Sequence, residues 1–172
     1  MDAGTETQFG LIRELAGLLG RAHIRFWLRG GWALDFHAGR VTRPHKDVDL
    51  ITWTRHRARL RRLLEANGYV TVRFDEPQVF FEKRGQEVNF AMIKRDSSGQ
   101  IVTPRFEEWP WPDGAFSGPP RTLFGVTCRA MTLEALADEK EGYEAWRGVP
   151  LRAKDEVSLR LLGELLGERE RG

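Results

Sequence analysis

Apolar residues along this chain recur first at helical spacing and then in short runs that are typical of strands. Leucine and isoleucine side chains within residues 7–21 repeat every three or four positions, which predicts an amphipathic helix. Apolar runs at 24–28 and 48–53 predict two strands, and residues 32–37 predict a short helix between them. Helical spacing returns over 55–67, where an Asn-Gly pair is typical of a helix end.

Three more strands are predicted in close succession, at 69–74, 78–83 and 87–93. The Arg-Gly-Gln sequence between the last two indicates a hairpin turn. A further strand is predicted much later in the chain, at 122–128. The spacing therefore predicts a sheet whose strands are interrupted by one long connection.

Residues 94–120 form that connection, which lacks a periodic pattern and is rich in Pro, Gly and Ser. A loop of this length is uncommon unless it has a function. Its aromatic side chains have two interpretations, a lid or wall for a bound acceptor, or a cap over the edge of the core. These side chains are Phe106, Trp109, Trp111 and Phe116.

The C-terminal part of the chain is predicted to be helical. Thr132 can cap a helix that runs past Glu139, and a last helix at 154–166 has its leucines on one side. The order of elements predicts an α/β (α+β) fold, in which a mixed sheet is flanked by helices and followed by a C-terminal helical pair. We expect a core domain at 1–128, long loop included, and a helical segment at 129–172.

Charge and length change this picture little. A chain of 172 residues can bury one core, and its formal net charge of +2 gives no overall basic field for nucleic acid. The basic cluster at 56–62 coincides with an apolar stripe, so we interpret it as the solvated face of a helix. The alternative interpretation is a contact surface for phosphate or RNA.

The expected location of the protein is inferred from its cysteine content and from features that the sequence lacks. Cys128 is the single cysteine, which excludes an internal disulfide, and its apolar surroundings predict a small buried side chain. No apolar run approaches the length of a membrane span, and the N-terminus has no secretion signal. We expect a cytoplasmic protein without a membrane partner, whose oligomeric state the sequence does not determine.

Two carboxylates carry the clearest chemical signal. Asp47 and Asp49 begin an apolar run, and on a strand two residues spaced in this way project from one face. Because like charges at this spacing repel, a shared divalent cation is the natural reason to keep both ionised. The pair therefore predicts a metal site.

A glycine pair precedes these acids. Gly30 and Gly31 follow the first predicted strand and open a short helical segment. Glycine lets backbone N–H groups approach an anion closely, and the dipole of a helix N-terminus favours phosphate there. A phosphate cradle followed by a metal-binding acid pair is the equipment for nucleotidyl transfer.

The whole pattern resembles that of the nucleotidyltransferase superfamily to which polymerase β belongs. It is carried by Gly30-Gly31, by the Gly-Arg-x-Thr-Arg-x-His run at 39–45, and by Asp47-Val48-Asp49. It is more similar still to the small bacterial enzymes that adenylylate an aminoglycoside 2''-hydroxyl or a lincosamide hydroxyl. Fainter similarity continues at 140–143 and 152–155.

The resemblance implies a nucleotidyltransferase-type sheet, Mg²⁺ in a site that can hold two metal ions, and ATP or another nucleoside triphosphate as substrate. It implies that Asp47 and Asp49 hold metal and serve catalysis, and that Gly30 and Gly31 bind the β- and γ-phosphates. In these enzymes a third carboxylate stands on a later strand.

Asn89 occupies the position of that third carboxylate. An amide oxygen can contact a metal ion, but an amide cannot act as a general base. Glu87 lies two residues away on the same face of the strand and can take the role of the base. We therefore assign Asn89 to the metal and Glu87 to catalysis.

Three residues between the glycines and the acids are secondary candidates. Arg40 and Arg43 can pair with phosphate oxygens or fix the loop, since guanidinium suits that geometry. They can equally bridge to Asp35 or to other acids on the surface. His45 is expected to orient its neighbours, because Mg²⁺ prefers oxygen ligands.

These residues and the resemblance together predict a Mg²⁺-dependent nucleotidyltransferase that moves a nucleoside monophosphate, AMP from ATP, onto a hydroxyl. The resemblance alone implies the acceptor, a small polar molecule such as an aminoglycoside or lincosamide antibiotic. Two alternatives stay open. Asn89 favours a catalytically degenerate nucleotide-binding protein, acting as a sensor or interaction module. The basic cluster at 56–62 is the support for a toxin-like enzyme that modifies RNA or protein.

Overall fold

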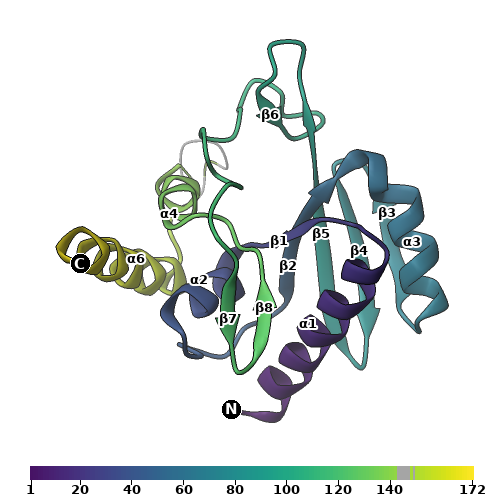
Figure 1. Ribbon diagram of the computed structural model, residues 1–172, viewed down its shortest axis with the longest axis horizontal. Helices are drawn as coiled ribbons and strands as arrows, with labels where there is room; N and C mark the ends of the chain where they lie inside the picture. Colours follow the sequence, from purple (N-terminus) through teal and green to yellow (C-terminus); the bar gives the residue numbers. More distant parts are fainter. Residues whose placement is uncertain (143–147, 149) are drawn as a thin grey trace.

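The computed structural model describes residues 1–142, 148 and 150–172. In this part of the chain a six-stranded sheet has the order β1-β2-β5-β4-β3, and β6 pairs with β5 (Figure 1). The pair β2–β5 is parallel and the other neighbours are antiparallel, which confirms the mixed sheet. The strands are β1 (Phe26–Leu28), β2 (Val48–Trp53), β3 (Val70–Asp75), β4 (Gln78–Lys83), β5 (Gln86–Arg95) and β6 (Ile101–Val102).

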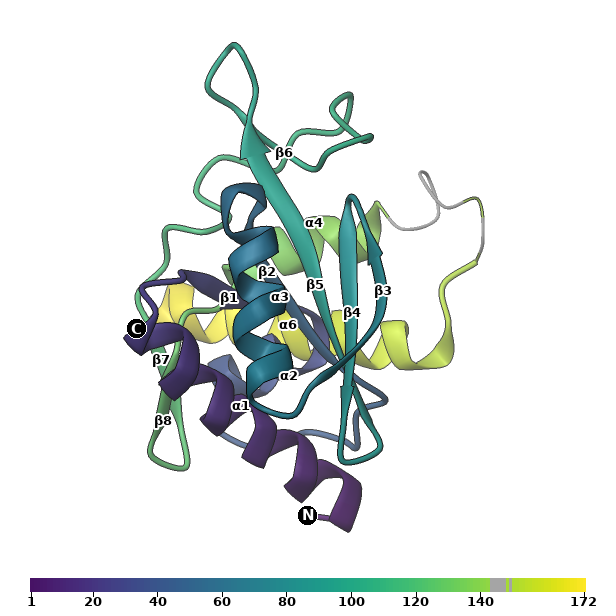
Figure 2. The ribbon, with the colours of Figure 1, turned by 90° about the vertical axis from the view of Figure 1, so that its right-hand side faces the viewer.

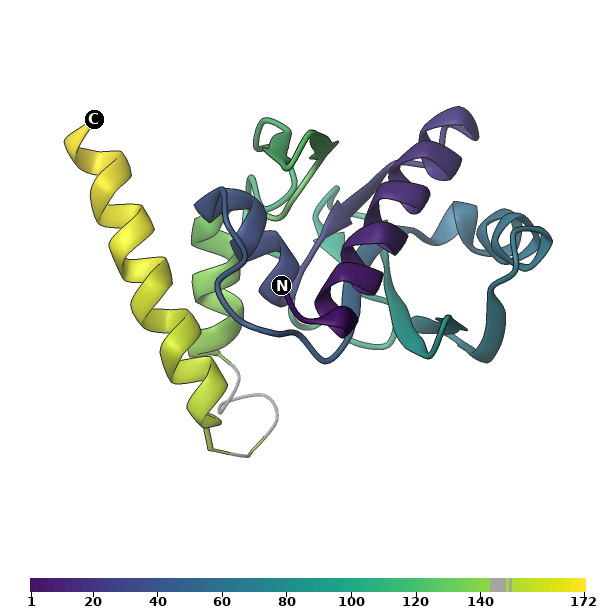
Figure 3. The same ribbon diagram turned by 90° about the horizontal axis from the view of Figure 1, so that it is seen from below.

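Helices cover both faces of this sheet. Figure 2 looks onto the sheet with α1 and α3 in front of the strands and α4 and α6 behind them. Figure 3, seen from below, shows α2 next to α4 and α6. The helices are α1 (Ala3–Arg21), α2 (Gly30–Ala38), the 3-10 turn η1 (Thr54–His56), α3 (Arg57–Ala66), α4 (Leu133–Glu141) and α6 (Ala153–Arg171). The predicted α/β class with flanking helices is confirmed.

The sheet buries one row of side chains and leaves the other row available for chemistry. Val88, Phe90 and Met92 of β5 are fully buried, and Leu50 of β2 joins them in the core. Asn89 alternates with these residues and is only partly buried. The period of two along a strand thus separates the core face from the face that carries the polar residues.

Several element boundaries differ from the sequence prediction for local reasons. α1 begins four residues early, at Ala3, because the Asp2 carboxylate accepts a hydrogen bond of 2.7 Å from the Thr5 N–H and caps the helix. The predicted strand at 122–128 is wrong. β7 (Arg121–Leu123) and β8 (Val126–Cys128) form a hairpin instead, because Phe124 and Gly125 take positive φ values of 45° and 78°.

The C-terminal helices are as predicted where the structure describes them. Thr132 caps α4 by accepting a hydrogen bond of 3.3 Å from the Ala135 N–H. Cys128 is buried, as expected, and this burial raises the pKa of its thiol to about 12. Tyr143, at the end of the weakly similar segment 140–143, lies outside the described residues. The domain boundary at residue 128 stays a prediction. No described helix is long and apolar enough to cross a membrane.

Candidate active site

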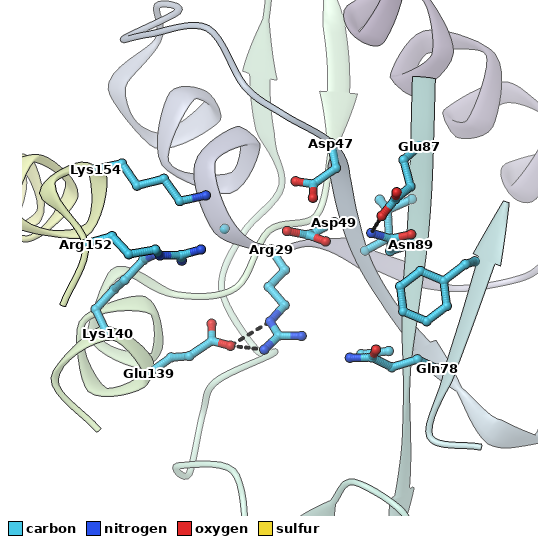
Figure 4. Close-up of a pocket in the computed structure, with 14 residues that line it drawn as sticks. Arg29, Asp47, Asp49, Gln78, Glu87, Asn89, Glu139, Lys140, Arg152 and Lys154 are labelled. Atoms are coloured by element: carbon cyan, nitrogen blue, oxygen red, sulfur yellow. Dashed lines mark hydrogen bonds and ion pairs between the residues drawn. The ribbon is translucent and has the colours of Figure 1, made fainter. Parts of the chain in front are cut away.

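The predicted acids meet on two adjacent strands. Asp49 of β2 lies directly opposite Asn89 in the parallel ladder with β5. Asp47 precedes β2, and Glu87 lies on β5 two residues before Asn89. These four residues, called the acid side below, line one cavity of about 320 Å³, the first cavity (Figure 4). The structure therefore brings together residues that are about 40 positions apart in the chain.

The electrostatics of the acid side favour a bound cation. Burial and the neighbouring Asp47 carboxylate raise the pKa of Asp49, and the Arg29 guanidinium offsets part of that rise. A carboxylate that is buried beside another carboxylate is stabilised in its charged form by a metal ion. The protein alone therefore does not fully compensate the negative charges of Asp47 and Asp49.

Asn89 turns its amide nitrogen toward Asp49 and its oxygen away from it (Figure 4). Its Nδ2 donates a hydrogen bond of 2.7 Å to Oε1 of Glu87, which fixes the orientation of the amide. The Asn89 Oδ1 is buried and has no hydrogen-bond partner among the described residues. A buried amide oxygen without a partner is unfavourable. A cation beside Asp47 and Asp49 would satisfy it only after the amide turned its oxygen toward Asp49. The role of Asn89 as a metal ligand stays a prediction.

The donor set fits Mg²⁺. In the described part of the chain no group of three or more His, Cys, Asp or Glu side chains is placed to hold a metal ion. Mg²⁺ does not need such a cage, because it keeps several waters and is bound through one or two carboxylates together with substrate phosphates. Asp47 and Asp49 provide that smaller set.

The two glycines at the start of α2 have different surroundings. Gly30 has a φ of +62°, and a Cβ on it would lie 3.3 Å from Oδ2 of Asp49. Gly30 therefore needs to be glycine for its backbone angle and for the close approach of the carboxylate. A Cβ on Gly31 would collide with the His45 ring, so the space at Gly31 is taken by that imidazole.

His45 belongs to a buried hydrogen-bond network that orients the loop before β2. Its Nε2 lies 2.6 Å from Oδ2 of Asp35, and the Thr42 hydroxyl donates to the other oxygen of that carboxylate. The His45 carbonyl accepts a hydrogen bond of 3.1 Å from Gln8 of α1. Because Asp47 follows two residues later, this network sets its position.

Arg40 and Arg43 do not line the first cavity. Arg40 is exposed, and Arg43 donates to the carbonyl of Pro44 at 3.1 Å. Neither forms the bridge to Asp35, whose two oxygens are used by Thr42 and His45. Their contact with phosphate stays a prediction.

The opposite wall of the first cavity is basic, and the sequence analysis did not assign it a role. Lys140 from α4 and Arg152 and Lys154 from the start of α6 point toward Asp47 and Asp49 (Figure 4). These three residues are called the basic side below. The sequence signal for these residues was the weak similarity at 140–143 and 152–155, from which no role was inferred.

A buried carboxylate organises the basic side. Asp155 is fully buried, and its Oδ1 lies 2.5 Å from the Lys140 ammonium. The Nε of Arg152 donates to Oδ2 of Asp155 at 2.7 Å. Burial alone would raise the pKa of Asp155, but its hydrogen bonds to Arg152 and Lys140 outweigh burial and lower the pKa. Burial and the nearby Arg152 also lower the pKa of Lys154.

A second cavity of about 550 Å³ adjoins the first and shares Arg29, Gln78, Ala91 and Glu139 with it. Arg29 donates to Glu139 through Nε at 2.7 Å, so this ion pair forms part of both walls. The pair keeps Arg29 charged, because the attraction of Glu139 raises the pKa of the guanidinium although burial opposes it.

The aromatic residues of the long loop divide between the two interpretations. Phe116 is buried against Trp27, with ring centroids 5.2 Å apart, and caps the core. Phe106 and Trp109 are 43% and 56% exposed and line the second cavity. Trp111 does both, since it packs on Phe116 and also lines the cavity.

Comparison with known proteins matches this chain to one family. The model of the aminoglycoside-2''-adenylyltransferase family matches residues 11–162, which is most of the chain. The chain belongs to this family. The residues of the acid side all lie within the matched range.

Individual relatives are more distant than the family match suggests. A 2''-aminoglycoside nucleotidyltransferase of Klebsiella pneumoniae is 37% identical over 70 residues, which is 40% of this chain and 40% of the relative. One of Escherichia coli is 37% identical over 62 residues, or 36% and 35% of the two chains. The alignments thus span about two fifths or less of the curated relatives.

Solved structures extend the likeness to the whole fold. The crystal structure of ANT(2'')-Ia in complex with adenylyl-2''-tobramycin has a TM-score of 0.78 at 23% identity, covering 95% of this chain and 92% of that one. Lincomycin-bound LnuA, a lincosamide antibiotic adenylyltransferase, has a TM-score of 0.74 at 20% identity, covering 95% and 99%. At 23% and 20% identity, this likeness shows that the chain shares the fold of these two enzymes.

Proposed function

We propose that this protein transfers AMP from Mg²⁺-ATP to a hydroxyl of a small acceptor of the aminoglycoside or lincosamide kind. The observation that carries the proposal is the first cavity, where an acid side faces a basic side at the N-terminus of α2. A triphosphate with its metal needs this arrangement of carboxylates, cations and helix N–H groups. The named activities of the relatives support the same reaction.

On the acid side, Asp47 and Asp49 would hold Mg²⁺, and the Asn89 Oδ1 would join them if the amide turned its oxygen toward Asp49. When bound, the metal supplies positive charge that neutralises the phosphates and stabilises the displacement. Gly30 and Gly31 carry the first backbone N–H groups of α2, which would bind the β- and γ-phosphates. Of the two glycines, Gly30 lines the first cavity and Gly31 does not. Together these groups position the triphosphate.

The basic side acts on the leaving group. Lys140, Arg152 and Lys154 balance the negative charge that develops on pyrophosphate as it departs. Glu87 accepts the proton of the acceptor hydroxyl as the bond to the α-phosphorus forms. The Asn89 amide donates to Glu87 and holds one carboxylate oxygen in place, so the other oxygen is available for the proton.

The test is pyrophosphate release from ATP by the full chain with Mg²⁺, with tobramycin or lincomycin as acceptor. We expect release with wild type and with Glu164→Gln, a control at an exposed residue of α6 that lines neither cavity. Asp49→Asn should show none. Release that is equal in Asp49→Asn and wild type would refute the proposal.

One alternative is favoured by a specific observation, the amide at position 89. A degenerate member would bind Mg²⁺-ATP and release no pyrophosphate with any acceptor, and Asn89→Asp would then create activity. The toxin-like alternative gains no support, because the cavities include none of residues 56–62. Within this cluster Arg57 lies 3.8 Å from the Phe74 ring and Arg61 pairs with Glu65.

A further inference from the structure

Nitrogen donors of the chain itself flank Asp49. On the side of β5, Asp49 faces the amide nitrogen of Asn89, and the amide oxygen points the other way (Figure 4). The hydrogen bond of 2.7 Å from this nitrogen to Glu87 holds the amide in that orientation. Turning the amide over would bring its oxygen against the carboxylates of Glu87 and Asp49, which only accept hydrogen bonds when ionised. The nitrogen therefore stays toward Asp49 unless a further cation separates these oxygens.

Position 89 is thus a poor ligand for a second metal ion. In a two-metal site the ions lie about 3.5–4 Å apart, and each needs oxygen ligands. Asp47 and Asp49 can bridge such a pair, but the third position presents an N–H group, which cannot bind a cation. Among the described residues, no group of three or more His, Cys, Asp or Glu side chains is placed to hold a metal ion. The ligands suffice for one Mg²⁺ bound together with phosphates, and not for two.

Arg29 places a fixed positive charge beside the same carboxylate. Its backbone N–H donates to the Asp49 carbonyl at 2.9 Å, so its side chain starts next to the metal-binding residue. Both Nε and Nη2 of the guanidinium donate to Glu139, and the centroid of the Trp111 ring lies 5.7 Å from its Cζ. Because the side chains of Arg29 and Glu139 are only 19% and 14% exposed, the guanidinium has little freedom to move.

One nitrogen of this guanidinium is left without a partner. Nη1 forms no hydrogen bond or ion pair with a described residue. It points away from Glu139 toward Gln78, another residue that lines the first cavity (Figure 4). The basic side approaches from α4 and α6, whereas Arg29 follows the end of β1 beside Asp49. Nη1 of Arg29 therefore faces a different part of a bound triphosphate from the basic side.

We propose that this site holds a single Mg²⁺ ion, on Asp47 and Asp49, and that Arg29 binds the α-phosphate where a two-metal enzyme places its second ion. A guanidinium can stabilise the charge that develops on a transferring phosphoryl group, as an arginine does in other phosphoryl transfers. The bonds to Glu139 keep Arg29 in place before the nucleotide arrives. The inference rests on the proposed function for the transfer step, but it makes separate claims about the metal count and the phosphate contact.

The first test counts metal ions on the full chain. Titration with Mn²⁺, followed by the EPR signal of the free ion, measures how many ions bind per chain in complex with α,β-methylene-ATP, which cannot release pyrophosphate. We expect one ion in wild type and two in Asn89→Asp, because a carboxylate at position 89 completes the second set of ligands. Asn67→Asp, which adds the same charge outside both cavities, should bind one. Two ions in wild type, or one in Asn89→Asp, would overturn the inference.

The second test locates the Arg29 contact along the triphosphate. Calorimetry with Mg²⁺ compares α,β-methylene-ATP, which has an α-phosphate, with inorganic pyrophosphate, which does not. Arg29→Gln should weaken nucleotide binding about tenfold or more, as for loss of a charge-assisted hydrogen bond, and leave the pyrophosphate affinity unchanged. Arg25→Gln, at an exposed arginine that lines neither cavity, is the matched control. Equal losses for both ligands would show a structural role, and no loss for either would exclude the contact, so both results would overturn the inference.

Failure of the proposed function has a different result. In that case wild type releases no pyrophosphate from ATP with either acceptor, while the ion counts and the Arg29→Gln comparison still come out as expected. If release occurs and wild type binds two ions, the proposed function stands and the inference fails.

Discussion

The two sides of the first cavity are held in place by different forces. On the acid side, Asp49 and Asn89 are fixed by the backbone ladder between β2 and β5. On the basic side, Lys140 and Arg152 come from α4 and from the N-cap of α6, and they are held by side-chain bonds to Asp155. A backbone ladder tolerates side-chain replacement, whereas the basic side depends on one carboxylate. We therefore expect acid-side changes to alter turnover and basic-side changes to alter stability and nucleotide affinity.

The largest expected effect is on the acid side. Asp49→Asn should abolish turnover and Mg²⁺-dependent ATP binding, because the metal loses one of its two carboxylates. The same change should stabilise the protein without ligand, since it removes a buried charge beside Asp47. Turnover, calorimetric ATP binding and the free energy of unfolding measure these effects. Unchanged ATP affinity with Mg²⁺ present would contradict the assignment.

The pH dependence of that stabilisation has a definite sign. The pKa of Asp49 is raised in the folded protein, so its ionised form destabilises the fold at neutral pH and its protonated form does not. The advantage of Asp49→Asn over wild type should therefore be present at neutral pH and disappear as the pH falls through the ordinary aspartate range. An advantage that grows in acid would be inconsistent with the raised pKa.

The next effect separates base from metal ligand on β5. Glu87→Gln should lower kcat by about 10²–10⁴-fold, as for loss of a general base, with ATP affinity nearly intact. Asn89→Asp should keep or raise activity, because it restores a third carboxylate. If Asn89→Asp gains activity and Glu87→Gln changes nothing, Glu87 is not the base and residue 89 marks a degenerate site.

The basic side is tested by removing its central carboxylate. Asp155→Asn leaves Lys140 and Arg152 without their buried partner and should lower the free energy of unfolding by about 2 kcal/mol, less than for a fully buried pair because both cations are partly exposed. The pKa of Asp155 is lowered by its partners, so this contribution is present at neutral pH and is lost as the pH falls through the folded pKa. Denaturant unfolding of Asp155→Asn and wild type at neutral and acid pH measures it. A difference that persists unchanged in strong acid would contradict the ion-pair explanation.

The smallest expected effect comes from removing one cation, Lys154, from the basic side. Lys154→Met removes one cation from the basic side and keeps much of the side-chain volume, so ATP affinity should fall about fivefold. Glu164→Gln, on an exposed part of α6, is a control for changes in this helix. A fall in kcat with unchanged ATP affinity would show that Lys154 contributes to the chemical step.

The difference between a backbone ladder and side-chain pairing also explains which parts of the structure could be predicted from the sequence. β2 and β4 have the predicted boundaries, because alternating or continuous apolar residues at 48–53 and 78–83 are a local signal. The hairpin of β7 and β8 was missed because Phe124 takes a positive φ that its residue type does not indicate. The acid side could be predicted from a motif. The basic side could not, because Lys140 and Arg152 come together only when Asp155 joins two helices in the folded chain.

The pairing of Asp49 with Asn89 also limits how the length of this chain can vary. Adding one residue to β5 just before position 89, with the preceding residues in place, would turn the amide into the core and remove it from its position opposite Asp49. An insertion in the loop at 103–120 shifts no side chain of the acid side. The loop can therefore gain or lose residues without moving the acid side, whereas the stretch from the Arg84-Gly85 turn to Asn89 has to keep its residue count.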